Sequence, residues 1–284
     1  MSSESDVTLP SIAFLGTGSM ARAVLSGLLV PGVTVEGGIR TTNRTAEKAT
    51  ELADLPGVTA LATETDPDAN LRAVADAGIV VVAVKPAMVP DLLREIAPAL
   101  APGTLVLSVA AGVTVATFES LLPENVSVIR TMPNTPAVVG RAVTGISAGT
   151  RSSDADLALA TALFETVGDV LVVPESQLDA LSTISGSGPA YVFFLIEQLE
   201  AAAVAKGFTA EEAATMVRGT FRGASELLAA SEGVDPAELR RRVTSPKGTT
   251  ERAIAVLADA GLEETFTRAT DAALARAKEL AAGS

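Results

Sequence analysis

The chain has 284 residues, of which 48% are apolar and 19% charged, and its formal net charge is −13. It is long enough for two domains with buried cores, and its acidity argues against a broad surface for nucleic acid or anionic lipid, since phosphate contacts need clustered Lys and Arg. It contains no Cys and no His, which excludes disulfides, thiol nucleophiles, the usual zinc sites and any His general base. We therefore expect no metal site.

The chain shows no pattern of a membrane segment or a secretory signal. No stretch approaches the roughly 18 uninterrupted apolar residues of a spanning helix. The N-terminal residues are polar and lack the apolar core of a signal peptide. We therefore expect a cytoplasmic protein that binds a small molecule, with any anionic ligand held locally by helix ends and a few cations.

Residues 11–29 have the pattern that opens a dinucleotide-binding βαβ unit. An apolar run from Ile12 to Leu15 has strand length, and Gly16, Gly18 and Ala21 follow at the spacing of the glycine-rich turn. Gly16 permits a tight exit from the strand, Gly18 leaves room for a pyrophosphate, and Ala21 lets the next helix lie close. The N-terminus of that helix offers N–H groups to an anion. The cofactor contacts expected in this turn are Gly16, Thr17, Gly18, Ser19 and Met20.

A second strand is predicted over residues 33–40, and its end should lie beside the adenosine ribose. Glu36 falls near the start of this strand, and the Thr-Thr-Asn-Arg sequence of residues 41–44 after it contains no acid. A carboxylate there would bind a 2′-hydroxyl, whereas an arginine and hydroxyls suit a 2′-phosphate. Asn43 and Arg44 are therefore expected to bind NADPH, and NADH is the alternative cofactor. The alternative interpretation of Arg44 is that it is a solvated loop residue with no ligand.

Further strands are predicted at residues 58–61, 78–84, 104–109 and 126–130, with a helix near residues 89–100. Ligands of open α/β sheets gather at the carboxyl ends of strands, so the residues that follow these strands are candidates for cofactor binding. Two prolines stiffen the Met-Pro-Asn-Thr-Pro turn of residues 132–136, for which a purely structural role is the alternative. The candidates at these strand ends are Val84, Lys85, Pro86, Ala110, Ala111, Gly112, Pro133 and Asn134.

The β/α alternation is predicted to continue with a strand at residues 142–148, a helix from Ser153 or Asp154 to Thr166, and a strand at residues 169–173. The sequence therefore predicts an α/β fold with two domains. Residues 1–173 form a dinucleotide-binding Rossmann domain with a doubly wound, mainly parallel sheet. Residues 174–284 form an all-α helical domain for dimerisation and substrate binding.

The first helix of the second domain is predicted to open at Gly188-Pro189 and to close at Lys206-Gly207. Residues 190–196 are apolar without a break, and a helix that is apolar on all sides must be buried. Because this domain is too small to surround it, a second subunit is the expected cover. Capping boxes are predicted for the next two helices, at Thr209 with Glu212 and at Asp235 with Glu238.

Residues 245–250 form a polar loop, Ser-Pro-Lys-Gly-Thr-Thr, before a helix that Gly261 ends. Hydroxyls, a flexible glycine and one cation at a helix N-terminus suit a small carboxylate. Ordinary capping of the helix by threonine is the alternative, and it would prevail unless the loop reaches the nicotinamide end of the cofactor. The last helix is predicted over residues 262–280.

With these stretches identified, the chain resembles the pyrroline-5-carboxylate reductases. The resemblance spans almost the full length, and the Met-Pro-Asn-Thr-Pro turn, the Gly-Ser-Gly-Pro-Ala-Tyr helix start and the Ser-Pro-x-Gly-x-Thr loop are individually distinctive. The matching segments, in family order, are residues 16–21, 84–86, 108–113, 130–136, 185–191 and 245–250.

The resemblance implies reduction of 1-pyrroline-5-carboxylate to L-proline by NAD(P)H, the last step of proline biosynthesis. It also implies a homodimer, or a decamer of five dimers. In the family the Ser-Pro loop holds the substrate carboxylate and its last threonine lies beside the ring nitrogen, which makes Thr250 the catalytic candidate. Lys247 stands where the family often has glycine, so its role stays open. The substrate contacts implied are Ser245, Gly248, Thr249 and Thr250.

This chemistry agrees with the composition. A protonated cyclic imine accepts hydride without a strong protein acid, so the protein mainly has to position the reactants. A related imine or 3-hydroxyacid reductase is the alternative, although Lys206 and Lys247 lack the motif context of a hydroxyacid enzyme's lysine. A protein that binds the cofactor without catalysis is a second alternative.

Overall fold

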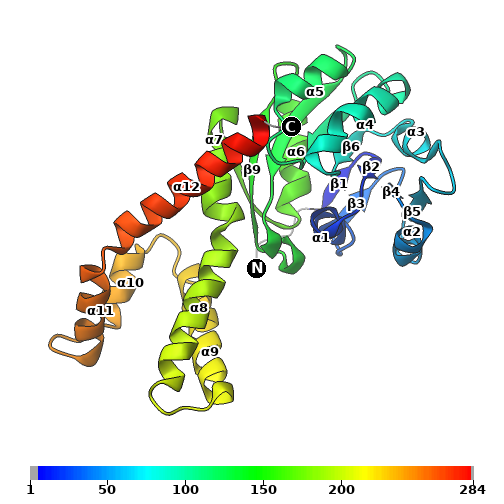
Figure 1. Ribbon diagram of the computed structural model, residues 1–284. Coiled ribbons are helices and arrows are strands. Elements are labelled where there is room, and N and C mark those ends of the chain that lie inside the picture. Colours follow the sequence, from blue (N-terminus) through cyan, green and yellow to red (C-terminus); the bar gives the residue numbers. More distant parts are fainter. Residues whose placement is uncertain (1–5, 283–284) are drawn as a thin grey trace. The chain divides into compact units, whose positions relative to one another are not determined.

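The computed structural model describes residues 6–282, which divide into two compact units (Figure 1). The first unit comprises the residues up to Ser187 together with those from Ala273 onward, and the second comprises Gly188–Ala272. The first unit extends past residue 173 because α7, Glu175–Leu181, packs on its sheet. The functional boundary between residues 173 and 174 stays a prediction.

The first unit is built on a sheet with the strand order β10-β9-β8-β7-β6-β2-β4-β5. All neighbouring strands are parallel except β8 and β9. The chain leaves β2 in one direction toward β4 and β5 and returns in the other toward β6, β7 and β8, so the point of reversal lies between β2 and β6. This confirms the doubly wound, mainly parallel sheet. The strands are β2 Ile12–Leu15, β4 Ile39–Asn43, β5 Val58–Ala62, β6 Ile79–Val82, β7 Leu105–Ser108, β8 Ser127–Met132, β9 Ala142–Ala148 and β10 Gly168–Val172.

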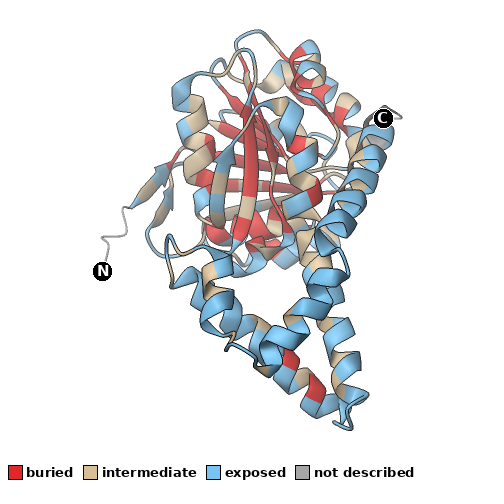
Figure 2. Ribbon diagram, turned by 90° about the vertical axis from the view of Figure 1, so that its left-hand side faces the viewer, coloured by how far each residue is buried: buried red, intermediate tan, exposed pale blue. Residues whose placement is uncertain are grey.

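Helices cover both faces of this sheet, and each face has its own hydrophobic core. Successive side chains of a strand point to opposite faces, so Phe14 joins the core under α1 and α6 while Leu15 joins the core under α3, α4 and α5. Both side chains are fully buried, and the sheet is the most buried part of the molecule in Figure 2. The helices are α1 Ser19–Gly27, α2 Ala46–Ala53, α3 Ala69–Val74, α4 Val89–Ile96, α5 Val115–Leu121 and α6 Asp154–Glu165.

The single strand predicted over residues 33–40 is wrong. Gly37 and Gly38 have φ of +80° and +77°, a left-handed conformation that a strand does not contain. The chain therefore turns there: β3, Val33–Val35, pairs with β1, Val7–Leu9, in a separate two-stranded sheet, and β4 begins only at Ile39.

Between β8 and β9 the βα alternation also departs from the prediction. β9 has the predicted bounds, but it runs antiparallel to β8, and only a 3-10 helix, Thr135–Val139, connects them. A connection this short suits antiparallel neighbours, because a parallel pair needs a crossover of a dozen or more residues. The helix predicted near residues 89–100 ends at Ile96 and is followed by a 3-10 helix, Ala97–Ala99. The predicted cap of α6 is confirmed, with Ser153 and Asp156 forming a capping box.

An ion-pair cluster fixes α7 on the sheet. Arg130 of β8 is buried, and its guanidinium donates to Glu175 at 3.4 Å and to Asp179 at 2.5 Å. Glu175 also accepts from the backbone N–H of Val115, at the start of α5, at 2.7 Å. A buried cation needs such compensation. α7 then continues into a π-helix, Ser182–Gly186, which sequence reasoning did not predict.

The second unit consists of helices, as predicted. Thr209 and Glu212 form the predicted capping box of α9. At α10 the predicted box is only half present: Asp235 accepts from the Ala237 N–H, but Glu238 binds Arg241 and Arg242 instead of returning to the cap. The helices are α8 Gly188–Val204, α9 Ala210–Ala229, α10 Pro236–Arg242, α11 Thr249–Asp259 and α12 Leu262–Ala282, the last of which extends into the first unit.

Apolar side chains of α8 are exposed in a single copy of the chain. No residue of this helix is buried, and Phe193 and Phe194 are 61% and 58% exposed. Such an uncovered apolar face is typical of a protein–protein interface. Across residues 6–282, no helix has the combination of length and apolar character that crossing a membrane would require.

Candidate active site

The predicted cofactor residues of the first unit come together at one edge of its sheet. β2, β4, β6, β7 and β8 are parallel, so their carboxyl ends meet at this edge, which we call the cofactor edge. Its centre is the point of reversal between β2 and β6, where open α/β sheets bind their ligands. The cofactor edge carries Gly16–Met20, Asn43, Arg44, Val84–Pro86, Ala110–Gly112, Pro133 and Asn134.

Gly16 and Gly18 differ in what surrounds them. Gly16 has φ +84°, and a Cβ there would lie 2.9 Å from Val84 Cγ1 and 3.0 Å from the Ala83 oxygen. Only glycine fits this exit from β2. Gly18 has φ −76°, and a Cβ would meet nothing within 4 Å. The fold therefore does not require glycine at position 18. Glycine is required there only if a ligand approaches the backbone closely.

The N-terminus of α1 is left open. Gly18 is its N-cap, and no side chain accepts from the first turn. The loop before it is held by its own hydrogen bonds: buried Thr17 donates to the Thr42 oxygen at 3.2 Å, and Arg22 donates to the Thr17 oxygen at 3.1 Å. A rigid loop with free N–H groups at a helix N-terminus is the arrangement that binds a pyrophosphate.

The end of β4 contains polar groups with no partner. Asn43 is buried and its Nδ2 donates to nothing, and the Thr45 hydroxyl at the start of α2 is likewise buried without a partner. Arg44 between them is exposed, and no ion pair of its guanidinium is seen in the described part of the chain. Both unpartnered donors are covered from solvent, so the exposed guanidinium of Arg44 is the group that fits the 2′-phosphate of NADPH.

Asn134 holds the two-proline turn in place. Its Oδ1 accepts from the Val143 N–H and its Nδ2 donates to the Ser185 oxygen, both at 2.9 Å. One side chain thus ties the end of β8 to β9 and to the π-helix. The structural role weighed for this turn is therefore present, while contact of Pro133 and Asn134 with the cofactor stays a prediction.

The loop of residues 245–250 in the second unit is locally ordered. The Gly248 N–H donates to the Ser245 oxygen at 3.0 Å, and the Lys247 N–H donates to Glu251. Gly248 is the N-cap of α11, with no side-chain cap, so the α11 N-terminus is open like that of α1. Thr249 and Thr250 form its exposed first turn, which contradicts capping by threonine. Lys247 has φ +61°, which explains why glycine suits this position.

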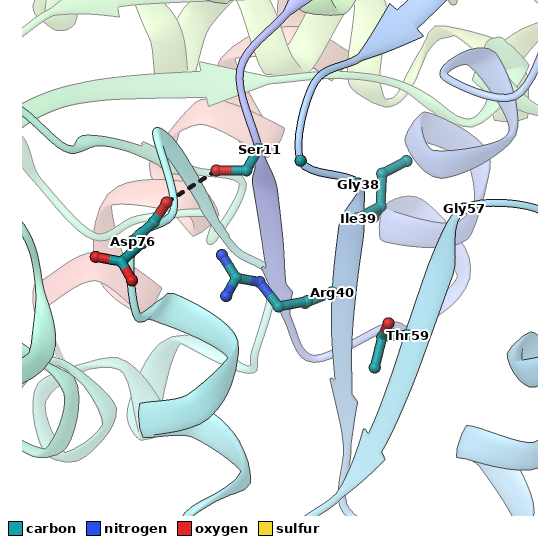
Figure 3. A pocket seen from close by; sticks show the side chains of 8 residues that line it. Ser11, Gly38, Ile39, Arg40, Gly57, Thr59 and Asp76 are labelled. Atoms are coloured by element: carbon teal, nitrogen blue, oxygen red, sulfur yellow. Dashed lines mark hydrogen bonds between the residues drawn. The ribbon is translucent and has the colours of Figure 1, made fainter.

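A cavity of about 310 Å³ lies at the opposite edge of the sheet (Figure 3). It is lined by residues where β4 and β5 begin, including Arg40 and Thr59, and by Ser11, whose hydroxyl donates to the Asp76 oxygen at 2.9 Å. None of the predicted site residues lines it. Within residues 6–282, no three acidic, Cys or His side chains cluster as metal ligands would.

Comparison with known proteins agrees with this geometry. Residues 175–280 match the family model described as pyrroline-5-carboxylate reductase dimerisation, and residues 11–112 match that described as NADP oxidoreductase, coenzyme F420-dependent. A pyrroline-5-carboxylate reductase of Pseudomonas aeruginosa is 39% identical over 97% of this chain and 98% of its own length. The chain belongs to the pyrroline-5-carboxylate reductase family.

Other members support this membership. Pyrroline-5-carboxylate reductase 2 of Bacillus subtilis is 36% identical over 96% of this chain and 95% of its own length. The structure of a pyrroline-5-carboxylate reductase from Coxiella burnetii superposes with a TM-score of 0.87 at 37% identity, covering 95% of this chain and 97% of that one. The resemblance drawn from the motifs is therefore confirmed.

Sequence reasoning missed one charged residue at the cofactor edge. Glu64, after β5, accepts from the N–H of Ala46 at the start of α2 at 2.5 Å, so an acid does lie beside the end of β4. Residues 41–44 at the end of β4 contain no acid, whereas Glu64 follows the neighbouring strand β5. The signal for Glu64 is its position: it follows β5 about as closely as Arg44 follows β4, and parallel neighbouring strands bring such positions together.

Proposed function

We propose that this protein reduces 1-pyrroline-5-carboxylate to L-proline with a hydride from NAD(P)H. The observation that carries the proposal is identity of 39% along almost the whole chain to a pyrroline-5-carboxylate reductase, together with an intact glycine turn at the cofactor edge. The alternative of a 3-hydroxyacid reductase is not favoured, because the relatives reported above carry the reductase name over their full length.

NADPH is the proposed cofactor, with NADH as the alternative. The match to an NADP oxidoreductase model over residues 11–112 and the exposed cation of Arg44 support this choice. The open α1 N-terminus would take the pyrophosphate, and Lys85 and Ala110, which follow β6 and β7, would border the nicotinamide half. When bound, the reduced nicotinamide supplies the hydride.

The loop of residues 245–250 is proposed to bind the substrate. The N–H groups of the open α11 N-terminus would hold the carboxylate, and the Thr250 hydroxyl would bind the ring nitrogen. Hydride transfer requires the bound ring to lie against the nicotinamide. A crystal with NADP⁺ and proline in which residues 245–250 lay away from the nicotinamide would contradict this assignment.

The activity itself is tested by measuring the loss of NADPH absorbance with 1-pyrroline-5-carboxylate. In parallel, the gain of NADPH absorbance is measured with NADP⁺ and each of several short 3-hydroxyacids. The proposal expects turnover with the imine alone. Turnover with a hydroxyacid alone would favour the related reductase, and binding of NADPH without any turnover would favour a cofactor-binding protein.

We further propose a cytoplasmic homodimer in which α8 is covered by a second copy, alone or within a decamer of five dimers. The match of residues 175–280 to a dimerisation model and the exposed Phe193 and Phe194 support the interface. Light scattering should show that Phe194→Glu dissociates the dimer, whereas the exposed, polar-face substitution Glu211→Gln on α9 leaves it intact. A monomeric wild type would overturn this assembly.

A further inference from the structure

The position of Glu64 has a consequence for cofactor choice. β4 and β5 are parallel neighbours with Asn43 opposite Ala62, and the pairing continues past the strands, because the Glu64 N–H donates to the Arg44 oxygen at 3.1 Å. The backbone therefore fixes Glu64 beside the end of β4. From there its carboxylate accepts from the Ala46 N–H at 2.5 Å.

Glu64 occupies the place of a helix cap. Thr45 is the N-cap of α2, yet its side chain makes no capping hydrogen bond and its hydroxyl is buried without a partner. The carboxylate of Glu64 takes one of the α2 N–H groups instead. A negative charge thus lies beside the end of β4, where the exposed cation of Arg44 would receive a 2′-phosphate.

The two cofactors would meet this carboxylate differently. A 2′-phosphate carries about two negative charges, is repelled by Glu64, and competes with it for the α2 N-terminus. A 2′-hydroxyl can donate a hydrogen bond to a carboxylate, as it does to the acidic residue of NAD-binding folds. Glu64 would therefore weaken binding of the 2′-phosphate of NADPH, whereas Arg44 would strengthen it.

We propose that Glu64 is a specificity-determining residue that limits the preference of this enzyme for NADPH over NADH. This inference rests on the proposed binding of the cofactor at the end of β4. An acid at the end of β4 would favour NADH by binding the 2′-hydroxyl. We infer that Glu64, which follows the neighbouring strand β5, has this effect instead.

The test is Glu64→Gln, measured by fluorescence titration of the dissociation constants of NADPH and NADH. Glutamine keeps an oxygen for the Ala46 N–H and removes only the charge. Because Glu64 is exposed, its effect is modest: NADPH should bind roughly three- to tenfold more tightly, NADH no more tightly, and the NADPH gain should shrink at high salt. Asp54→Asn, which removes an exposed charge at the other end of α2, should leave both constants unchanged.

An unchanged ratio of the two constants in Glu64→Gln, with NADPH still bound, would overturn the inference and leave the proposed function standing. An equal gain in Asp54→Asn would also overturn it, because net charge would then explain the effect. A wild-type protein that bound neither cofactor would be a different result, since it would overturn the proposed function as well.

Discussion

Alanine at Gly18 should weaken cofactor binding without disturbing the fold, and alanine at Gly16 should disturb the fold itself. The two glycines lie two residues apart in one turn and form a matched pair, because each substitution adds the same methyl group. Only the surroundings of that methyl differ: open space at Gly18, and Val84 with the Ala83 backbone at Gly16.

The magnitudes follow from these surroundings. At Gly16 the φ of +84° imposes about 1–2 kcal/mol of backbone strain, and the 2.9 Å contact with Val84 adds overpacking of about 1–3 kcal/mol. The sum of about 2–5 kcal/mol is a large part of a typical folding free energy of about 5–15 kcal/mol. At Gly18, alanine loses up to about 1 kcal/mol as an N-cap and gains about 0.4–1 kcal/mol by restricting the unfolded chain, so the net change is close to zero.

The assay combines thermal unfolding with fluorescence titration of NADPH. Gly18→Ala should unfold at the wild-type temperature and bind NADPH about tenfold or more weakly, a loss of about 1.4 kcal/mol or more. Gly16→Ala should unfold at a clearly lower temperature. Wild-type affinity in Gly18→Ala would refute the close approach of the pyrophosphate to this backbone, and wild-type stability in Gly16→Ala would refute the described exit from β2.

Three further predictions concern the second unit. Thr250→Ala should lower turnover roughly tenfold or more, or about 1.4 kcal/mol in the barrier, with unchanged thermal stability because Thr250 is exposed; an unchanged rate removes Thr250 from the mechanism. Lys247→Gly should raise the free energy of unfolding in urea by up to about 1 kcal/mol, because a side chain at φ +61° is strained, and a loss of stability would contradict this. Hydrogen bonds from Arg241 and Arg242 lower the pKa of Glu238 to about 2, so this carboxylate stabilises α10 above its unfolded pKa of about 4.3 and the contribution is lost as pH falls toward 2. An NMR titration of the Glu238 carboxyl carbon checks this pKa, and a midpoint near 4.3 in the folded protein would contradict the ion pairs.

The parts of the fold that sequence reasoning predicted are those with local causes. The turn after β2, the bounds of β9 and the cap of α6 at Ser153 depend on residues within a few positions of one another. The strand predicted over residues 33–40 is wrong because it includes Gly37 and Gly38, whose left-handed conformations end one strand and precede another.

The parts that could not be predicted depend on contacts between distant segments. Asn134 is a predicted site residue, and its bonds to Val143 and Ser185 involve β9 and a π-helix far along the chain. Arg130 gave no signal of its ion pairs with α7. Glu64 acts on α2 from the neighbouring strand. The pairing of β4 with β5, which sequence does not give directly, brings Glu64 to α2.

Helix N-termini offer one physical explanation for how a chain without His or Cys could carry out this reduction. α6 and α9 close their N-termini with complete capping boxes. α1 and α11 begin after Gly18 and Gly248 and, like α3, α4 and α7, receive no side-chain cap. A capping oxygen would occupy the place of a ligand oxygen, so glycine there keeps the N–H groups free for an anion. Both groups proposed to bind there are anions, a pyrophosphate of the cofactor and the carboxylate of the substrate. Once both are bound, hydride transfer requires that the nicotinamide and the substrate ring be correctly positioned. The backbone N–H groups of α1 and α11 would thus bind these two anions. The side chains of the neighbouring loops would then orient the substrate and set the preference between NADPH and NADH.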